Sequence, residues 1–434
     1  MPTKPNFYGW KLVGVLWLLD FLNMGFPLYG GTIIHSYMRK QIALSGATYG
    51  FGFTLLNWFV GVPSVIVGAV IVRWGIRRTF AIGSALILIG ALWLAVITTK
   101  PWHYLVGFGV LAGTGISFGT IVPAATAVTR WFKRYRGRAM AIPLSASGFA
   151  GFVIAPLINK VLAANGGNWR QAWEIVAGVA ILSGIIAFLF VKERPEDLGQ
   201  TVDGEAMATA ASASSRVTDS LVSKYPWTPS QAFATPAYWM IVIGGLACQY
   251  PFFFFTAHWV PHLKGAGVQA GDAAFAMGLF ALGAVAGRLI GGWLMDLLQA
   301  RYAFILGLCC YFAGTVLALR AGPHALWTAY VAAILYGVAF GWTFICLNTA
   351  TGHFFGPAAY HKVNGMALAL GGLICSPAGV IGGRLFDVYG NYRLAFQLNM
   401  LIAATGIVAL FFAKMPTPPV ENHQPAVSRV AQET

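Results

Sequence analysis

The stretch AAFAMGLFALGAVAGRLIGGWLMDLLQAR, residues 273–301, decides the fold. Its first part is an apolar helix of about 22 residues, long enough to cross a bilayer, and it contains one arginine, Arg288. An ionisable side chain at that depth costs between about 3 and more than 10 kcal/mol, which favours a functional role. Gly283, Gly287 and Gly291 recur at four-residue spacing and predict a helix packed closely around the arginine. The alternative is a structural Arg288 that pairs with a buried carboxylate.

The composition indicates that most of the chain lies in a membrane. Of 434 residues, 58% are hydrophobic and only 9% are charged, against a charged share of about 25% in soluble domains. Reading from one charged or Pro/Gly-rich break to the next predicts twelve spans and an all-helical membrane protein. The predicted spans are 10–36, 47–72, 79–98, 103–129, 138–163, 171–191, 236–262, 273–298, 302–320, 325–353, 363–388 and 393–414.

The basic residues predict the orientation. With both termini on one side, 18 of the 28 Lys and Arg residues fall in the termini and even-numbered loops, nine fall in odd-numbered loops, and one is Arg288. This excess is the positive-inside pattern, so we expect both termini in the cytoplasm and the protein in the cell (inner) membrane. It also explains the formal net charge of +15 without nucleic acid as a partner.

Two halves of six spans are expected. The predicted division is an N-terminal bundle at 1–192, a cytoplasmic linker at 193–233 and a C-terminal bundle at 234–434. The linker contains an Ala/Ser-rich segment that cannot form a core. WRQAW at 169–173 is echoed by YRLAF at 392–396 at nearly the same offset as two other matches, which is typical of transporters built from repeats.

A basic turn follows spans 2 and 8. Its residues are Arg73, Gly75 and Arg77 in the first copy and Asp296 and Arg301 in the second. With two halves of six helices, this pattern resembles the major facilitator superfamily, whose loop G-x-L-x-D-R-x-G-R-R ties neighbouring helices together at the cytoplasmic face. The first copy departs from that pattern with Val72 at the aspartate position, and the second departs with Gln299 at the glycine.

Further segments resemble the monocarboxylate transporter branch and the related oxalate/formate antiporters. They are YGW at 8–10, RWFKRYRG at 130–137, RPEDLG at 194–199, TPAYW at 235–239, HWVPHL at 258–263 and LFDVYG at 385–390. In that family the arginine of span 8 binds the substrate carboxylate, and its place before Gly292 and Asp296 matches Arg288. Oxalate-type members add a lysine in span 11, whereas residues 369–373 here carry no charge, so the resemblance implies a monoanion.

Asp20 is the one carboxylate deep within a predicted span. Counted at 1.5 Å per residue, it lies ~15 Å beyond Trp10, and Arg288 lies ~12 Å from Asp296, so the two charges are expected at similar depth. Our hypothesis is that deprotonated Asp20 neutralises Arg288, whereas protonated Asp20 frees the guanidinium for a carboxylate. The alternative is an Asp20 that faces away and makes only a local polar contact.

Six further residues are candidates for substrate binding. A histidine can donate to a carboxylate, carry a proton or simply bond within its helix, and buried amides serve either interhelical hydrogen bonds or a pore. Aromatic residues could close over a small substrate or belong to the core. These candidates are His258, Asn57, Asn348, Tyr29, Tyr336 and Phe340. A further histidine, His35, is expected near the exterior interface.

The sequence contains no G-x-S-x-G elbow, P-loop, H-E-x-x-H or Cys-x-x-Cys motif, so no enzyme activity, cofactor or metal is expected. The prediction is a monomeric secondary transporter of lactate- or pyruvate-type monocarboxylates that works with a proton by alternating access. An uncoupled exchanger or exporter of another organic anion is the second possibility. A membrane sensor with a transporter-like fold is the third, and it would predict a large soluble domain.

Overall fold

The computed structural model describes residues 7–132, 135–202, 223 and 225–417, and the regular elements within these ranges are helices. The all-helical fold class predicted from the sequence is therefore confirmed. The elements of the first six spans are α1 (Tyr8–Met24), η1 (Gly25–Gly30), α2 (Gly31–Gln41), α3 (Gly46–Gly61), α4 (Ser64–Trp74), α5 (Ile76–Leu92), η2 (Trp93–Ile97), α6 (Pro101–Tyr104), η3 (Leu105–Ala112), α7 (Gly113–Gly119), α8 (Ile121–Trp131), α9 (Arg136–Ala164) and α10 (Trp169–Phe190).

The predicted linker contains two short elements, η4 (Pro195–Leu198) and α11 (Pro229–Phe233). The second set of helices follows them and consists of α12 (Pro236–Gly265), α13 (Ala270–Leu297), α14 (Ala300–Ala318), η7 (Pro323–Ala325), α15 (Leu326–Cys375), α16 (Ala378–Tyr389) and α17 (Arg393–Phe412). Helix α15 combines two predicted spans, and the break between them is Gly356, whose φ of 66° is unfavourable for residues with a side chain.

The predicted number of spans agrees with the described helices. Eleven helical stretches are long and apolar enough to cross a membrane, and the pair 46–61 and 66–74, bent by 45°, raises the number to twelve. The bend follows Pro63, which lacks the backbone N–H needed to continue a regular helix.

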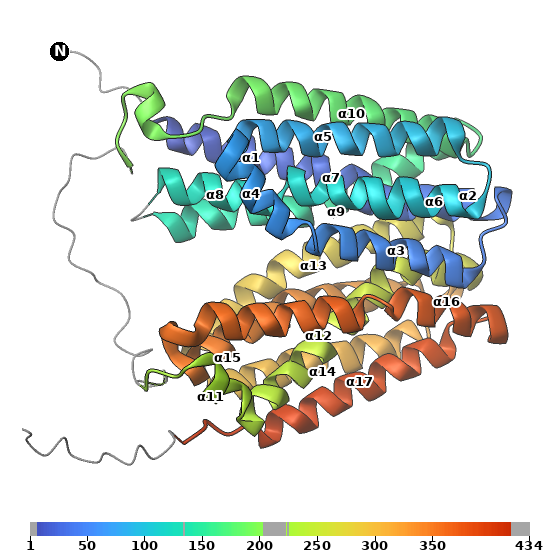
Figure 1. Ribbon diagram of the computed structural model, residues 1–434. Helices are drawn as coiled ribbons and strands as arrows, with labels where there is room; N and C mark the ends of the chain where they lie inside the picture. The colour runs from blue at the N-terminus through green and yellow to red at the C-terminus, as the bar shows by residue number, and fades with distance from the viewer. Residues whose placement is uncertain (1–6, 133–134, 203–222, 224, 418–434) are drawn as a thin grey trace, which may run out of the picture.

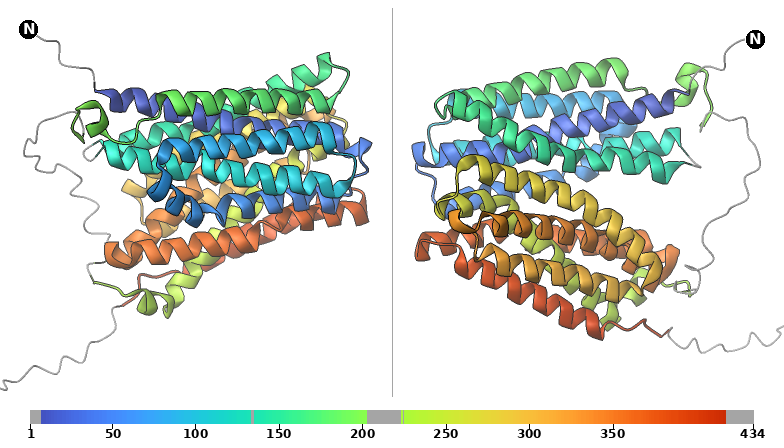
Figure 2. Two further views of the ribbon diagram at one scale, coloured as in Figure 1. Left: turned by 45° about the horizontal axis from the view of Figure 1, so that its top comes forward. Right: turned by 180° about the vertical axis from the view of Figure 1, so that it is seen from behind.

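Figure 1 shows the two sets of helices as adjacent bundles, with α1 to α10 in one and α12 to α17 in the other. The start of α1, the end of α10, α11 and the end of α17 lie at one end of the molecule, which we call the linker end. The turns that follow α2 and α16 lie at the opposite end, which we call the far end (Figures 1 and 2). Most of the predicted linker, 203–222 and 224, lies outside the described residues.

The glycine stripe of α13 packs against α15, as its spacing predicts. A Cβ added to Gly287 would lie 2.1 Å from the carbonyl oxygen of Val338, and one added to Gly283 would lie 2.7 Å from that of Ile334. Helix α15 also contributes a glycine to this contact: a Cβ on Gly341 would lie 2.0 Å from the carbonyl oxygen of Ala284. The backbones are therefore in direct contact beside Arg288, an approach that only glycine permits.

The two bundles meet mainly along two helix pairs, α9 with α13 and α3 with α16, with smaller contacts of α12 and α15. The second pair is packed backbone to backbone at the far end, since a Cβ on Gly50 would lie 1.8 Å from the carbonyl oxygen of Gly379. The same is true one turn away, where a Cβ on Gly383 would lie 1.9 Å from the carbonyl oxygen of Gly46. The structure is thus closed between the bundles at the far end.

Candidate functional site

The side chain of Arg288 projects from the face of α13 that packs against the other bundle. Two residues of the same face, Ala281 and Val285, pack against Gly148 and Gly151 of α9. One turn beyond them the Arg288 guanidinium donates a hydrogen bond of 2.8 Å to the carbonyl oxygen of Leu144. The arginine therefore links the two bundles through one backbone oxygen, and the remaining guanidinium N–H groups have no partner in the described contacts.

Tyr29 and helix α1 approach the same part of α9. Tyr29, in η1, is 5% exposed, lies beside Gly151 and is close enough to Arg288 for the two to interact electrostatically. Trp17 of α1 donates a 3.2 Å hydrogen bond to the hydroxyl of Ser145, the residue after Leu144. The structure therefore brings η1, α9 and α13 together near Arg288, and α1 contacts α9 at the residue next to Leu144.

Asp20 lies on α1 one turn beyond Trp17 and is 4% exposed. Its Oδ1 is buried without a hydrogen-bond partner. The ion pairs that the described residues form within 4.0 Å are Arg39–Asp387 and Arg130–Glu193. Asp20 and Arg288 are therefore not in direct contact in this arrangement, so the neutralising pair of our hypothesis is not formed here.

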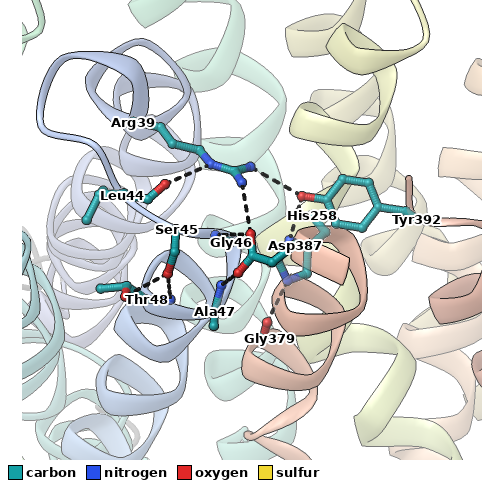
Figure 3. Close-up of polar contacts among 10 residues, drawn as sticks. All are labelled: Arg39, Leu44, Ser45, Gly46, Ala47, Thr48, His258, Gly379, Asp387 and Tyr392. Atoms are coloured by element: carbon teal, nitrogen blue, oxygen red, sulfur yellow. Dashed lines mark hydrogen bonds and ion pairs between the residues drawn. The ribbon is translucent and has the colours of Figure 1, made fainter. Parts of the chain in front are cut away.

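A second polar cluster closes the far end between the bundles (Figure 3). Asp387, near the end of α16, accepts hydrogen bonds from the backbone N–H groups of Gly46 at 2.7 Å and Ala47 at 2.9 Å. Its carboxylate is also 3.9 Å from the guanidinium of Arg39. An acid from one bundle thus caps the first turn of α3 in the other, where the helix dipole favours negative charge.

Tyr392 and His258 complete this cluster. The Tyr392 hydroxyl accepts from Arg39 at 3.4 Å and lies 3.2 Å from Nδ1 of His258. Nε2 of His258 is 2.7 Å from the carbonyl oxygen of Gly379, which can only accept, so Nε2 carries the proton and Tyr392 donates to Nδ1. Burial raises the pKa of Tyr392 to about 12, which keeps its hydroxyl a donor at neutral pH.

His258 is therefore placed in the far-end closure, with both ring nitrogens engaged. Its predicted place among the substrate-binding residues is not supported by its contacts, because they all belong to that closure. His35 is also placed differently from the prediction, since it is fully buried rather than interfacial. Its ring is enclosed by aromatic rings, the nearest being Phe108 at 4.3 Å and Tyr104 at 4.8 Å between centroids.

The two amide candidates, Asn57 and Asn348, are hydrogen-bonded to the backbone of their own helices. Asn57 donates to the carbonyl oxygen of Phe53 in its own helix. Asn348 donates to the carbonyl oxygen of Phe344 and accepts from Asn364, within the linker-end part of α15. Both amides therefore make hydrogen bonds within their own helices.

The two aromatic candidates of α15 are also engaged. Tyr336 is fully buried and shares a 2.6 Å hydrogen bond with Thr315. Phe340 is half-buried and stacks on Phe252 with ring centroids 3.9 Å apart. Among these candidates, Tyr29 is the one that lies within electrostatic range of Arg288.

The first basic turn is organised by an acid that the loop pattern does not include. Gly75 has a φ of 87°, and a Cβ there would lie 2.5 Å from the carboxylate of Glu193. Glu193 accepts from the backbone N–H groups of Ile76 and Arg77 at 2.8 and 2.9 Å and pairs with Arg130 at 3.2 Å. A carboxylate from beyond α10 thus caps α5, although Val72 stands at the usual aspartate position.

The other residues of the two basic turns make fewer contacts than Gly75 and Glu193, or their side chains lie outside the described part of the structure. Arg73 is exposed, and Arg77 extends over the ring of Phe188 at 5.1 Å. Arg301 donates to the carbonyl oxygen of Ala413 at 3.4 Å. The side chain of Asp296 lies outside the described part of the structure, so its predicted tie is not addressed.

Three charged residues that join helices in the structure were not predicted from the sequence. Arg39 and Asp387 are near the ends of predicted spans, where charged residues are common, and Glu193 is the first residue of the predicted linker. A signal was present in LFDVYG at 385–390, which contains Asp387. Within the part of the chain that the structure describes, no group of three or more His, Cys, Asp or Glu side chains is arranged to hold a metal ion.

The comparisons define the family. The model of the Major Facilitator Superfamily matches residues 16–379 and, in an overlapping match, 267–432. The chain therefore belongs to the major facilitator superfamily, a family of transporters rather than enzymes, and is a multi-pass secondary transporter. Solved structures agree on the fold. The nucleoside transporter NupG superposes with a TM-score of 0.70 at 14% identity over 92% of this chain and 98% of that one.

A bacterial homologue of the human lysosomal transporter Spinster, inward-facing and occupied, also gives a TM-score of 0.70, at 16% identity over 95% of this chain and 97% of that one. Among curated proteins, monocarboxylate transporter 13 of Rattus norvegicus is 28% identical over 80% of this chain and 75% of its own length. Monocarboxylate transporter 11 of Homo sapiens is 25% identical over 79% and 70%. The chain is thus similar to monocarboxylate transporters over most of its length.

Proposed function

We propose that the protein carries small monocarboxylates of the lactate or pyruvate type together with a proton, and that Arg288 binds the carboxylate. One observation carries the proposal: a guanidinium inside a membrane span, at the contact between the bundles, pairs with none of the described acidic residues. Its single recorded hydrogen bond, to Leu144, leaves donors for the two oxygens of a carboxylate.

Uptake of labelled lactate into proteoliposomes, with and without a pH gradient, tests this assignment. Arg288→Lys keeps the charge but loses the planar pair of donors, so uptake should fall at least tenfold. Arg320→Lys, the same change at an exposed position, is the matched control. Wild-type uptake by Arg288→Lys would exclude Arg288 as the carboxylate-binding residue.

Asp20 is the residue that we assign to the proton. A carboxylate that is buried without a partner is costly when charged, and binding a proton removes that cost. Asp20 would neutralise Arg288 in another state of the transport cycle, since the two are not paired here. Asp20→Asn should retain lactate exchange but lose lactate-driven proton uptake, and proton uptake that persists unchanged would disprove the assignment.

The orientation and state follow from the same proposal. With both termini in the cytoplasm, as the basic residues predict, the far end faces the exterior. The closed far end then corresponds to an inward-facing arrangement of the bundles. Labelling with a membrane-impermeant thiol reagent tests the orientation, because Ala164→Cys at the far end should react in intact cells, whereas Lys414→Cys at the linker end should react only in inverted membrane vesicles.

An exporter or exchanger of another organic anion is the second candidate. A relative from Gibberella fujikuroi, the fujikurins efflux protein, is 24% identical over 48% of this chain and 44% of its own length. Such a protein would either take up no labelled lactate or take it up only in exchange for an anion already inside the liposomes, and the uptake would not respond to a pH gradient.

A further inference from the structure

A cavity at the linker end lies beside the second basic turn, apart from Arg288 and from the far-end closure. Its volume is about 380 Å³, and it lies between the first turn of α14, the middle of α15 and the chain that follows α17. The spans Ala300–Ala318 and Arg393–Phe412 begin and end beside it, which places it at the membrane boundary. A hydrogen bond of 2.8 Å from the backbone of Ser223 to that of His353 holds the linker next to it.

The walls of this cavity combine basic and apolar side chains. Arg301, Lys414 and His353 contribute the basic groups, whereas Phe354 and Met415 contribute the apolar surface. No acidic residue lines the described walls. The cavity therefore presents positive charge beside an apolar surface.

Arg301 carries an unused donor at this place. Its guanidinium donates from one terminal nitrogen to the carbonyl oxygen of Ala413 at 3.4 Å and from the other to the hydroxyl of Tyr302 at 2.9 Å. Its Nε is buried and has no hydrogen-bond partner. A buried N–H without an acceptor is destabilising, so the guanidinium of Arg301 is incompletely hydrogen-bonded in the unliganded fold.

The first turn of α14 adds to the positive potential. Its N-cap residue, Gln299, makes no side-chain hydrogen bond to the first turn of this 19-residue helix, whose first backbone N–H groups have no acceptor within the helix. The positive end of the helix dipole is directed toward the same cavity, which Gln299 and Ala300 also line. Arg301, Lys414 and the helix end thus favour an anion with several acceptor oxygens.

We propose that this cavity binds a phosphate-bearing anion. Arg301 and Lys414 contact the phosphate oxygens, and the first turn of α14 adds backbone donors. Phe354 and Met415 contact carbon atoms next to the phosphate, as the headgroup region of an anionic phospholipid would supply. The bound anion joins α14, α15 and the end of α17, and it is independent of the substrate carried at Arg288.

Binding to the purified full-length protein in an uncharged detergent tests the proposal. One arm titrates phosphatidylglycerol, with phosphatidylcholine as the zwitterionic comparison of zero net charge, and follows bound lipid by native mass spectrometry. The other arm adds inorganic phosphate as a competitor. Displacement by phosphate identifies a site for free phosphate as well, whereas retention of the lipid identifies its headgroup as the occupant.

Two variants locate the site. Arg301→Gln and Lys414→Gln should each weaken phosphatidylglycerol binding about fivefold. Lys362→Gln is the matched control, because Lys362 is an exposed base at the same end that does not line the cavity. Lys414 is exposed, so its variant keeps the test valid if Arg301→Gln does not fold. Equal binding by Lys414→Gln and Lys362→Gln would overturn the proposal, as would equal binding of the two lipids by the wild type.

Discussion

The far-end closure depends on a carboxylate that spans the two bundles, and Asp387→Asn is the substitution that tests it. Asp387 accepts two backbone hydrogen bonds from α3, at 2.7 and 2.9 Å, and lies 3.9 Å from Arg39. Asparagine keeps one acceptor oxygen but loses the other oxygen and the charge. The closed arrangement should therefore become less stable relative to an arrangement in which the bundles separate at this end.

The magnitude follows from the two kinds of contact. A side-chain cap of a helix N-terminus contributes about 1 kcal/mol, and the charge roughly doubles the strength of such hydrogen bonds. An ion pair at 3.9 Å adds less than about 1 kcal/mol, although the side chains of Arg39 and Asp387 are only 19% and 23% exposed. A total loss of about 2 kcal/mol changes the ratio of closed to open molecules about 30-fold.

Pulsed electron–electron double resonance between two spin labels measures the ratio of closed to open molecules. Ala164 in one bundle and His324 in the other are exposed at the far end and can carry the labels in a cysteine-free background. Asp387→Asn should increase the population at longer distances. Asp272→Asn is the control, because Asp272 accepts a 2.9 Å hydrogen bond from Tyr330 within one bundle. An unchanged distance distribution in a folded Asp387→Asn protein would refute the reasoning.

Three further predictions concern the far-end closure and the carboxylate that caps α5. Gly50→Ala should abolish the short far-end distance because its Cβ would lie 1.8 Å from the carbonyl oxygen of Gly379; an unaltered distance would contradict this close packing. Glu193→Gln should destabilise the protein by about 1 kcal/mol, seen as a lower midpoint of thermal unfolding, because the acid that caps α5 loses its charge. Tyr392→Phe should loosen the far end equally between about pH 6 and 9, since burial raises the pKa of Tyr392 to about 12 and the hydroxyl stays protonated below that value; a pH-dependent effect would be inconsistent with this.

Much of the fold could be predicted because its signals are local. A membrane span requires a continuous apolar run of fixed length, so hydropathy places it without knowledge of its neighbours. The glycine stripe of α13 is also local, since residues four apart share a helical face. The family resemblance followed from short motifs along the chain, and the family match over residues 16–379 confirms it.

The candidate site was predicted only in part. Arg288 was identified because a charge inside an apolar helix is conspicuous in the sequence. His258 has the same appearance, yet it is hydrogen-bonded in the far-end closure. Asp387 and Glu193 were not singled out, because an acid at the end of a span is ordinary until its partner is known.

The sequence by itself determined the membrane spans, the place of Arg288 inside span 8 and the glycine face beside it, because each depends on residues within one helix. Only the tertiary structure decided that α15 occupies that glycine face, that Leu144 receives the guanidinium, and that Asp387 caps α3 in the other bundle. These contacts join residues far apart in the chain. Their geometry is fixed by how helices pack against one another, which the periodicity of a single helix does not specify.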